Sequence, residues 1–434
     1  MKISYIKNVL LKSIYSMADD PSPFVKNPGV DFTRNRKCTM SDLFIFLLTS
    51  ESGSLNREIR RYFGFKNTSI TKSALIQQRN KLNSEALPHL LTSINEDIPF
   101  KKRYKGYHLL AVDGSDVNVP PLINDLKTRV ESNTSGTYYH QVHLNALYDV
   151  LEERFVDIDI QPRAELNERK SFISFIEHDY FDKKCIYTAD RGFFSYNVLG
   201  HLLVENKHYL LRINSPEGRN AFLKQIPLPE SEEFDIELDF KITRRSVTFC
   251  KNRLGKYVSV RKDRPFDFIP PGDKEVEFPV AARLVKIRLS DDNYEYLLTN
   301  LNNDEFSMND LKELYHKRWG IETAFRFAKY TAGMNSFRSI KREFITQEIF
   351  ARIILYNLTS ALIQCVKVPE TGRKLRYKVS VSDAMITCRE FLIHKFKESE
   401  IKELLLNYLT DVRAGRKSQR KLRTKHYIPL SYRC

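Results

Sequence analysis

The segment YHLLAVDGSD, residues 107–116, combines a short apolar run with an acidic residue that directly follows it. Leu109 to Val112 are consecutive apolar residues, which is typical of a buried strand. Asp113 follows this run, and Gly114 indicates a turn immediately after it. The sequence therefore predicts a buried strand that presents a carboxylate at its carboxyl end.

A second segment, KCIYTADRGF at residues 184–193, repeats this design. The apolar run from Cys185 to Ala189 ends at Asp190, and Gly192 follows closely. Acidic residues beside turns often do no more than support the turn. Two strands of the same design favour a shared site for the two carboxylates instead.

The order of the other expected elements indicates an α/β fold. Between and after the two acidic strands, we expect strands at 143–148 and 155–160, a helix at 165–178, a short helix from Ser195, and a strand at 208–213. The polar break DVLEER between the first two of these strands predicts a hairpin. Strands that alternate with helices in this way form a layered α/β structure.

The stretch LYHKRWGIETAFRFAK, residues 314–329, predicts a helix with one charged face. Tyr315, Arg318, Glu322 and Lys329 fall within a stripe about 60° wide on a helical wheel. An adjoining stripe is apolar and consists of Leu314, Ile321, Ala324, Phe325 and Ala328. A helix face of mixed charge is commonly only a solvated surface. Alternatively, the Glu binds a metal ion while its neighbours hold phosphate, as phosphoryl transfer on nucleic acid requires.

Two further residues of this stretch are candidates for contacts with nucleic acid. Trp319, the only Trp of the chain, lies about 40° from Tyr315 on the wheel. Its side chain either stacks on an unpaired base or packs in the core. Arg326 is either a phosphate contact or an ordinary surface residue.

Together these pieces resemble the DDE transposases of bacterial insertion sequences, in the group defined by the YREK signature. The matching pieces are DGS at Asp113, ADRGFFSY around Asp190 and YHKRWGIETAFRFAK around Glu322, in that order between about Tyr107 and Phe337. The resemblance implies a ribonuclease H-like mixed sheet flanked by helices, in which the first and fourth strands are neighbours.

The resemblance also implies an activity, namely metal-dependent DNA cleavage at transposon ends and strand transfer into target DNA. Asp113 would be shared by two metal ions, with Asp190 on one and Glu322 on the other. Mg²⁺ is the expected ion, and Mn²⁺ can substitute because it also favours oxygen ligands. Tyr315, Arg318 and Lys329 would hold the DNA near the cleaved end.

The expected partners are double-stranded DNA, as transposon ends and as target, and a second copy of the chain in a synaptic homodimer. Two other functions stay open. One is a DNA-binding protein descended from a transposase that no longer catalyses, and the other is a stand-alone metal-dependent nuclease.

The composition agrees with a partner that carries phosphate. Lys and Arg number 70 against 54 Asp and Glu, which gives a formal charge of +16. A basic surface suits phosphate backbones and makes binding salt-dependent. No apolar run is long enough to span a bilayer. The six Cys lack C-x-x-C spacing, so we expect neither a zinc site nor a disulfide framework, and a reducing bacterial cytoplasm is the natural setting.

The chain divides into four expected regions. These are a helical region at 1–100 that either binds DNA ends or serves as a structural brace, a catalytic core at 101–214 and 306–345, a β-rich insertion at 215–305, and a helical region at 346–434 with a basic tail. In the first region, Ser54 is a predicted helix cap. The helix expected from Thr71 to Leu82 carries side chains that could reach phosphates or base edges, namely Lys72, Gln77, Gln78, Arg79 and Lys81.

Strands are expected in the insertion wherever apolar and polar residues alternate. The segments are DIELDFKI, SVTFCK, KYVSVRK, EVEFPVAARLVKIRL and YEYLLTNL. SDDN at 290–293 is the predicted turn between the last two.

Overall fold

A computed structural model describes residues 1–412, apart from 35, 52, 65–69, 123, 132–137, 182–183, 218–221, 291–292 and 370–375. The basic tail predicted from Arg413 onward lies outside the described residues. No helix among the described residues has the length and apolar character that a membrane crossing requires.

The centre of the molecule is a ten-stranded mixed sheet. Five of its strands form the core: β1 (His108–Val119), β3 (Tyr138–Asp149), β4 (Arg154–Pro162), β5 (Cys185–Ala189) and β6 (His208–Ile213). β1 pairs antiparallel with β3 and parallel with β5, while β4 joins β3 and β6 joins β5. The order β4-β3-β1-β5-β6 confirms the predicted fold, because the first and fourth core strands are neighbours.

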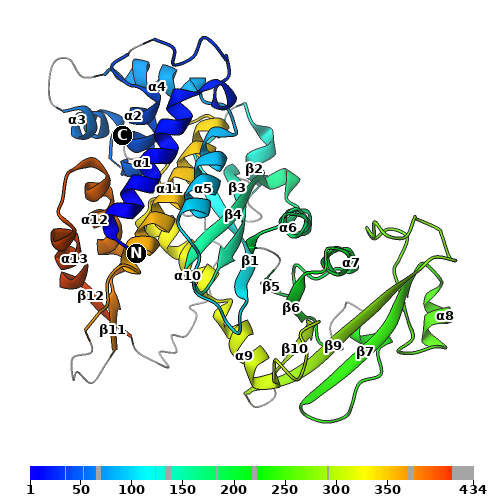
Figure 1. The fold of residues 1–434 in the computed structure, drawn as a ribbon. Coiled ribbons are helices and arrows are strands. Elements are labelled where there is room, and N and C mark those ends of the chain that lie inside the picture. The colour runs from blue at the N-terminus through cyan, green and yellow to red at the C-terminus, as the bar shows by residue number, and fades with distance from the viewer. Residues whose placement is uncertain are drawn as a thin grey trace.

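The strands of the insertion continue this same sheet beyond β6. They are β7 (Phe234–Thr243), β8 (Tyr257–Ser259), β9 (Glu277–Ser290) and β10 (Asn293–Thr299). β10 pairs with β6, and β9 and β7 follow outward, so the insertion forms an arm that extends away from the helical half (Figure 1). A short strand, β2 (Arg129–Glu131), covers the opposite end beside β3.

One strand predicted in the insertion is wrong. SVTFCK forms the short helix α8 (Val247–Lys251), because the Ser246 side chain caps it by accepting a hydrogen bond from the Phe249 N–H. Ser at this position satisfies one of the free N–H groups that begin every helix. Here the cap outweighs the β-branched and aromatic residues that follow it.

Helices cover both faces of the core sheet. On one face α6 (Glu168–Glu177) and α7 (Tyr196–Val204) pack through apolar side chains on Leu110 and Val112 of β1. On the other face Ala111 packs with Ile321 and with residues of α11 (Arg342–Ile363). Successive side chains of a strand point to opposite faces, so β1 contributes to both layers.

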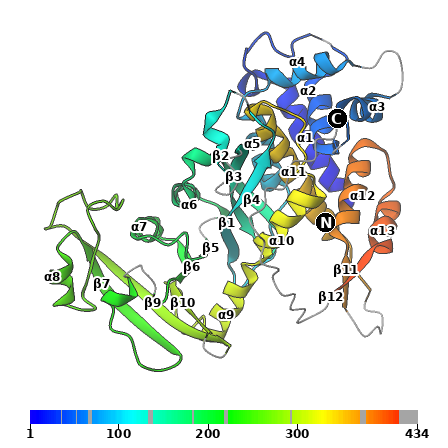
Figure 2. The ribbon, with the colours of Figure 1, turned by 180° about the vertical axis from the view of Figure 1, so that it is seen from behind.

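The N-terminal and C-terminal helical regions form one body around α11 (Figures 1 and 2). The N-terminal helices are α1 (Ile3–Asp19), α2 (Met40–Thr49), α3 (Leu55–Phe63), α4 (Lys72–Lys81) and α5 (Ala86–Asp97). The C-terminal elements are α12 (Val381–Ile393), α13 (Glu398–Asn407) and the strand pair β11 (Arg376–Val379) and β12 (Leu409–Val412). Ser54 caps α3 as predicted, by accepting a hydrogen bond from the Arg57 N–H.

The inner face of α4 is not available to DNA. Gln78 is buried, and the Arg79 guanidinium donates hydrogen bonds to Gln347 and Glu348 of α11. Lys72 and Gln77 lie on the exposed face. Any DNA contact of this helix is therefore confined to its outer residues.

Candidate active site

Asp113 lies within a strand rather than at a turn. β1 continues through Gly114, which pairs with Asn145 of β3, to Val119. A Cβ at Gly114 would lie 2.7 Å from Glu168 Oε1 and even closer to His143 Nε2. Any larger residue here would have to displace the His143 and Glu168 side chains, and the turn predicted at this residue is wrong.

Asp113 and Asp190 are nevertheless neighbours across the sheet. The parallel pairing of β1 with β5 ends at Val112 and Ala189, and each acidic residue is the next along its strand. β5 ends there while β1 continues to Val119, so the two aspartates lie side by side where the parallel pairing stops, and ligands of open α/β sheets commonly bind where parallel strands end. The two strands thus place two carboxylates at one edge.

The predicted signature helix is broken into three pieces. α9 (Met308–Lys317) is followed by Arg318 and Trp319, then by α10 (Gly320–Arg326) and a π-helical turn, η6 (Phe327–Thr331). Single π turns often occur at functional sites. The four signature residues therefore do not share one regular helical face, although Arg318 and Glu322 remain one turn apart.

Two acidic residues contact Arg318, which is 3% exposed, and a third, Asp190, lies nearby. Its Nη2 donates a hydrogen bond to Glu322 Oε1 at 3.1 Å, and its Nη1 lies 3.8 Å from Asp113 Oδ2. Asp190 Oδ1 accepts a hydrogen bond from the Tyr315 hydroxyl at 3.2 Å. β1 and α10 each bring one carboxylate into contact with this guanidinium, and Asp190, the residue after β5, lies close enough to affect its pKa.

The pKa values of the two aspartates are shifted in opposite directions. Burial raises the pKa of Asp113 to about 6, against the opposing effects of Arg318 and the Gly114 N–H. Burial also acts to raise the pKa of Asp190, but the Arg191 N–H, Arg318 and Arg212 hold it below its ordinary value. Asp113 is therefore the carboxylate whose ionised form would gain most from an added cation.

The donor set fits a hard divalent cation in its chemistry. Carboxylate oxygens are the ligands that Mg²⁺ and Mn²⁺ favour. Among the described residues, no three His, Cys, Asp or Glu side chains are grouped closely enough to hold a metal ion. Arg318 lies in contact with both Asp113 and Glu322, so a guanidinium supplies the positive charge in this arrangement.

The other candidate residues of the 314–329 stretch are Lys329, Trp319 and Arg326. Lys329 Nζ donates hydrogen bonds to Ser115 Oγ and to the Asp116 carbonyl, both at 2.6 Å, and so fastens η6 to β1. Trp319 is 43% exposed, which removes the core-packing alternative, and its ring lies 5.7 Å from the Arg318 guanidinium. Arg326 is exposed.

Sequence patterns did not identify two polar residues beside the site, Arg212 and His143. Arg212 of β6 lies 3.4 Å from Asp190 Oδ1, and a charged residue within the apolar run HYLLRI was the available signal. His143 lies 2.7 Å from Asp116 Oδ1 and 3.1 Å from Glu168 Oε1. These two carboxylates raise the pKa of His143 to about 9, although burial acts to lower it. The imidazole is therefore cationic and supports the strand next to Asp113.

The sheet order and the acidic edge define an α/β protein with a ribonuclease H-like core. A family model described as "Transposase DDE domain" matches residues 104–358, more than half of the chain, and the chain therefore belongs to this family. The match begins before β1 and ends within α11, so it includes Asp113, Asp190 and Glu322.

One solved structure that resembles the chain is a cryo-EM structure of the piggyBac transposase synaptic complex with hairpin DNA. The similarity has a TM-score of 0.45 and 11% sequence identity, over 95% of this chain and 87% of that chain. No protein among the curated sequences matches.

Proposed function

We propose that this protein is a cut-and-paste transposase of the YREK group of bacterial insertion sequences. It would cleave DNA at the ends of its element and join those ends to target DNA. The observation that carries the proposal is the contact of Asp113 and Glu322 with one guanidinium, that of Arg318, beside the point where the β1–β5 pairing ends and Asp190 follows. Membership of the transposase DDE domain family supports DNA as the substrate.

Each acidic residue has a role that follows from its position. When bound, two divalent cations such as Mg²⁺ or Mn²⁺ would stabilise the attacking and leaving oxygens of a phosphodiester. Asp113, which lies between the other two elements at the end of the β1–β5 pairing, would ligate both ions. Asp190 and Glu322 would each ligate one.

Arg318 and its neighbours would bind DNA rather than metal. A guanidinium is planar and donates two parallel hydrogen bonds, which suits a phosphate. Once cations neutralise Asp113 and Glu322, Arg318 would be available to a phosphate of the DNA end. Tyr315 would orient Asp190, and the exposed Trp319 offers a ring on which an unpaired base could stack. Synapsis of two ends would require two copies of the chain.

The products of a DNA reaction test this proposal. The substrate is a supercoiled plasmid that carries the gene with its natural flanking DNA, incubated with purified protein and Mg²⁺. We expect excised element and element joined to new target DNA, with EDTA as the negative control. Cut ends without joined product would identify a nuclease instead. Binding without either product would identify an inactive DNA-binding protein.

A further inference from the structure

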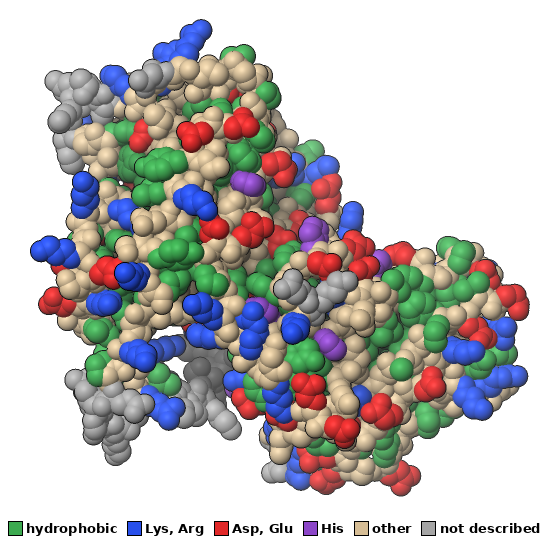
Figure 3. All heavy atoms as spheres, in the orientation of Figure 1, with side chains coloured by type: hydrophobic (Ala, Val, Ile, Leu, Met, Phe, Trp, Pro, Cys, Tyr) green, Lys and Arg blue, Asp and Glu red, His purple; other side chains and the backbone are tan. Residues whose placement is uncertain are grey.

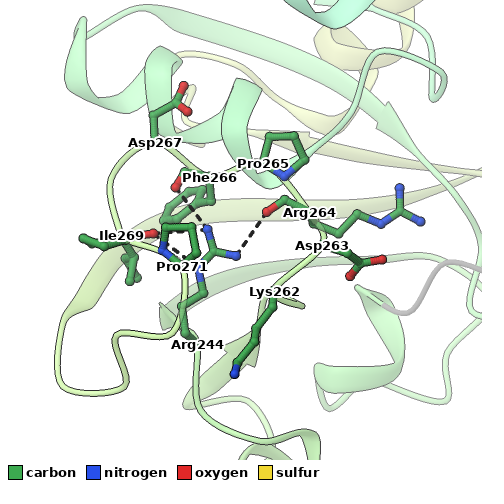
Figure 4. A pocket seen from close by; sticks show the side chains of 10 residues that line it. Arg244, Lys262, Asp263, Arg264, Pro265, Phe266, Asp267, Ile269 and Pro271 are labelled. Carbon is green, nitrogen blue, oxygen red and sulfur yellow. Dashed lines mark hydrogen bonds between the residues drawn. The ribbon is translucent and has the colours of Figure 1, made fainter.

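The insertion contains a loop whose backbone is fixed around a buried cation. This segment, residues 261–271 between β8 and β9, is called the insertion loop below. Arg244, which is 6% exposed, donates hydrogen bonds of 2.8–3.2 Å to four loop carbonyl groups (Figure 4). These belong to Arg261, Arg264, Phe266 and Ile269. Because four carbonyl groups share one guanidinium, the loop holds a defined shape before any ligand binds.

The insertion loop is docked on the catalytic core. Asp267 accepts a hydrogen bond from Asn197 Nδ2 and its N–H donates to Asn197 Oδ1, both at 2.8 Å. Asp267 Oδ2 also lies 3.0 Å from His201 Nε2. Phe268 packs so closely over Gly200 that a Cβ there would overlap its ring. All three partners belong to α7, which begins six residues after Asp190.

The docked loop presents cations at the edge that holds Asp190. Lys262 and Arg264 are exposed and have no side-chain partner among the described residues, and both line an open pocket of about 410 Å³. Arg169 of α6 donates a hydrogen bond at 3.2 Å to the Gly192 carbonyl, two residues beyond Asp190. Burial and the nearby charge of Arg264 both lower the pKa of Arg169, so these two cations are close.

Cations that a rigid scaffold holds close together repel one another, and an anion that binds between them offsets this repulsion. A preformed site also loses little conformational entropy on binding. In Figure 3 the basic side chains of the visible face are scattered among acidic ones, so the net charge alone marks no single binding surface there. The insertion loop differs because Lys262 and Arg264 stand on a fixed backbone, and Arg264 has a third cation, Arg169, nearby. The two acidic residues of the pocket, Asp263 and Asp267, are paired with Arg261 and His201.

We propose that the insertion loop is a preformed clamp for the phosphate backbone of DNA, with Lys262, Arg264 and Arg169 as the contacting residues. The location of the DNA rests on the proposed function, since the clamp lies beside the carboxylate that would act in cleavage. Contacts to phosphate carry no base information, so the clamp would bind DNA of any sequence and orient it toward Asp190.

Salt-dependent binding tests the clamp. The probe is a fluorescein-labelled duplex of arbitrary sequence, and its anisotropy with the full chain is measured across a salt series. Each lost phosphate contact reduces the slope of log affinity against log salt by about 0.9. We therefore expect the double variant Lys262→Ala/Arg264→Ala to lose about 1.8 from the slope.

The matched control is Lys395→Ala, which removes an exposed Lys between α12 and α13, and these helices belong to the helical half, away from the arm (Figure 1). A double variant whose slope matches that of Lys395→Ala would overturn the clamp. The two proposals fail separately. A wild-type protein that binds but neither cuts nor joins DNA removes the proposed function and leaves the clamp. If the wild type cuts and joins DNA but the double variant keeps the wild-type slope, the clamp is removed and the proposed function stands.

Discussion

Arg318 at the acidic edge is buried, Arg79 in the N-terminal helices is largely buried, and acidic residues hold both, yet their surroundings differ. Arg79 Nη1 donates to Glu348 Oε1 at 2.8 Å, its Nε donates to Gln347 Oε1 at 2.7 Å, and its Nη2 donates to the Phe344 carbonyl. Arg318 has one well-placed hydrogen bond to Glu322, a contact of 3.8 Å with Asp113, and an Nε without a partner among the described residues.

The difference separates a structural ion pair from a site prepared for ligands. A buried ion pair is held stably only when its hydrogen bonds are satisfied. Arg79 meets that condition and joins α4 to α11. Arg318 is left incompletely satisfied among partly exposed carboxylates, which is the arrangement expected where other groups bind during function.

The largest effect on stability should come from Arg79. Arg79→Met leaves Glu348 buried without its partner, so we expect a loss of about 3–5 kcal/mol in the free energy of unfolding. Arg318→Met should cost clearly less, because its acidic partners are more exposed. Chemical denaturation of the two variants measures both losses. Equal losses would remove the distinction between the two arginines.

Asp113→Asn should change how stability depends on pH. The folded-state pKa of about 6 lies above the ordinary value of 3.8, so between these values the folded protein binds more protons than the unfolded chain. The free energy of unfolding of the wild type should therefore fall as pH rises through this range, by up to about 3 kcal/mol. Asn does not titrate, so the variant lacks this component.

The measurement is the difference in unfolding free energy between Asp113→Asn and the wild type at a series of pH values. The difference should grow in favour of the variant from about pH 4 to about pH 6 and then stay constant. A difference that does not vary with pH would show that Asp113 is not a buried, destabilised carboxylate.

A smaller effect is expected from divalent cations on stability. Mg²⁺ or Mn²⁺ at about 10–30 times its Kd should stabilise the wild type by about 1–2 kcal/mol, because the folded site binds it and the unfolded chain does not. Glu322→Gln should lose most of this gain, whereas Glu348→Gln should keep it. Thermal unfolding with and without the cation measures the effect, and an equal gain in both variants would argue against metal binding at the acidic edge.

The fold was predictable where burial alone determines the structure. The strands expected at Cys185–Ala189 and at 208–213 are observed as β5 and β6 with the same bounds, because uninterrupted apolar runs admit few alternatives. The runs and the helices between them indicated only a layered α/β structure, and the pairing of the first and fourth core strands was predicted from the family resemblance.

Features that depend on tertiary contacts were not predictable from local patterns. Gly114 has the sequence context of a turn residue, but it lies within a strand where the side chains of His143 and Glu168 leave little space for a Cβ. Arg79 looks like a DNA contact, but its partners on α11 lie 268 and 269 positions along the chain. The break of the signature helix and the hydrogen bonds of Lys329 to β1 likewise cannot be read from a helical wheel.

DNA cleavage by single-residue variants tests the role of the three carboxylates most directly. Asp113→Asn, Asp190→Asn and Glu322→Gln each remove a negative charge with little change in shape. The control is Asp239→Asn, an exposed acidic residue on β7. We expect each of the three variants to lose cleavage by about 10³-fold or more while still binding the end DNA, and the control to cut like the wild type. Wild-type cleavage in Mg²⁺ by any of the three would contradict the assignment of that residue.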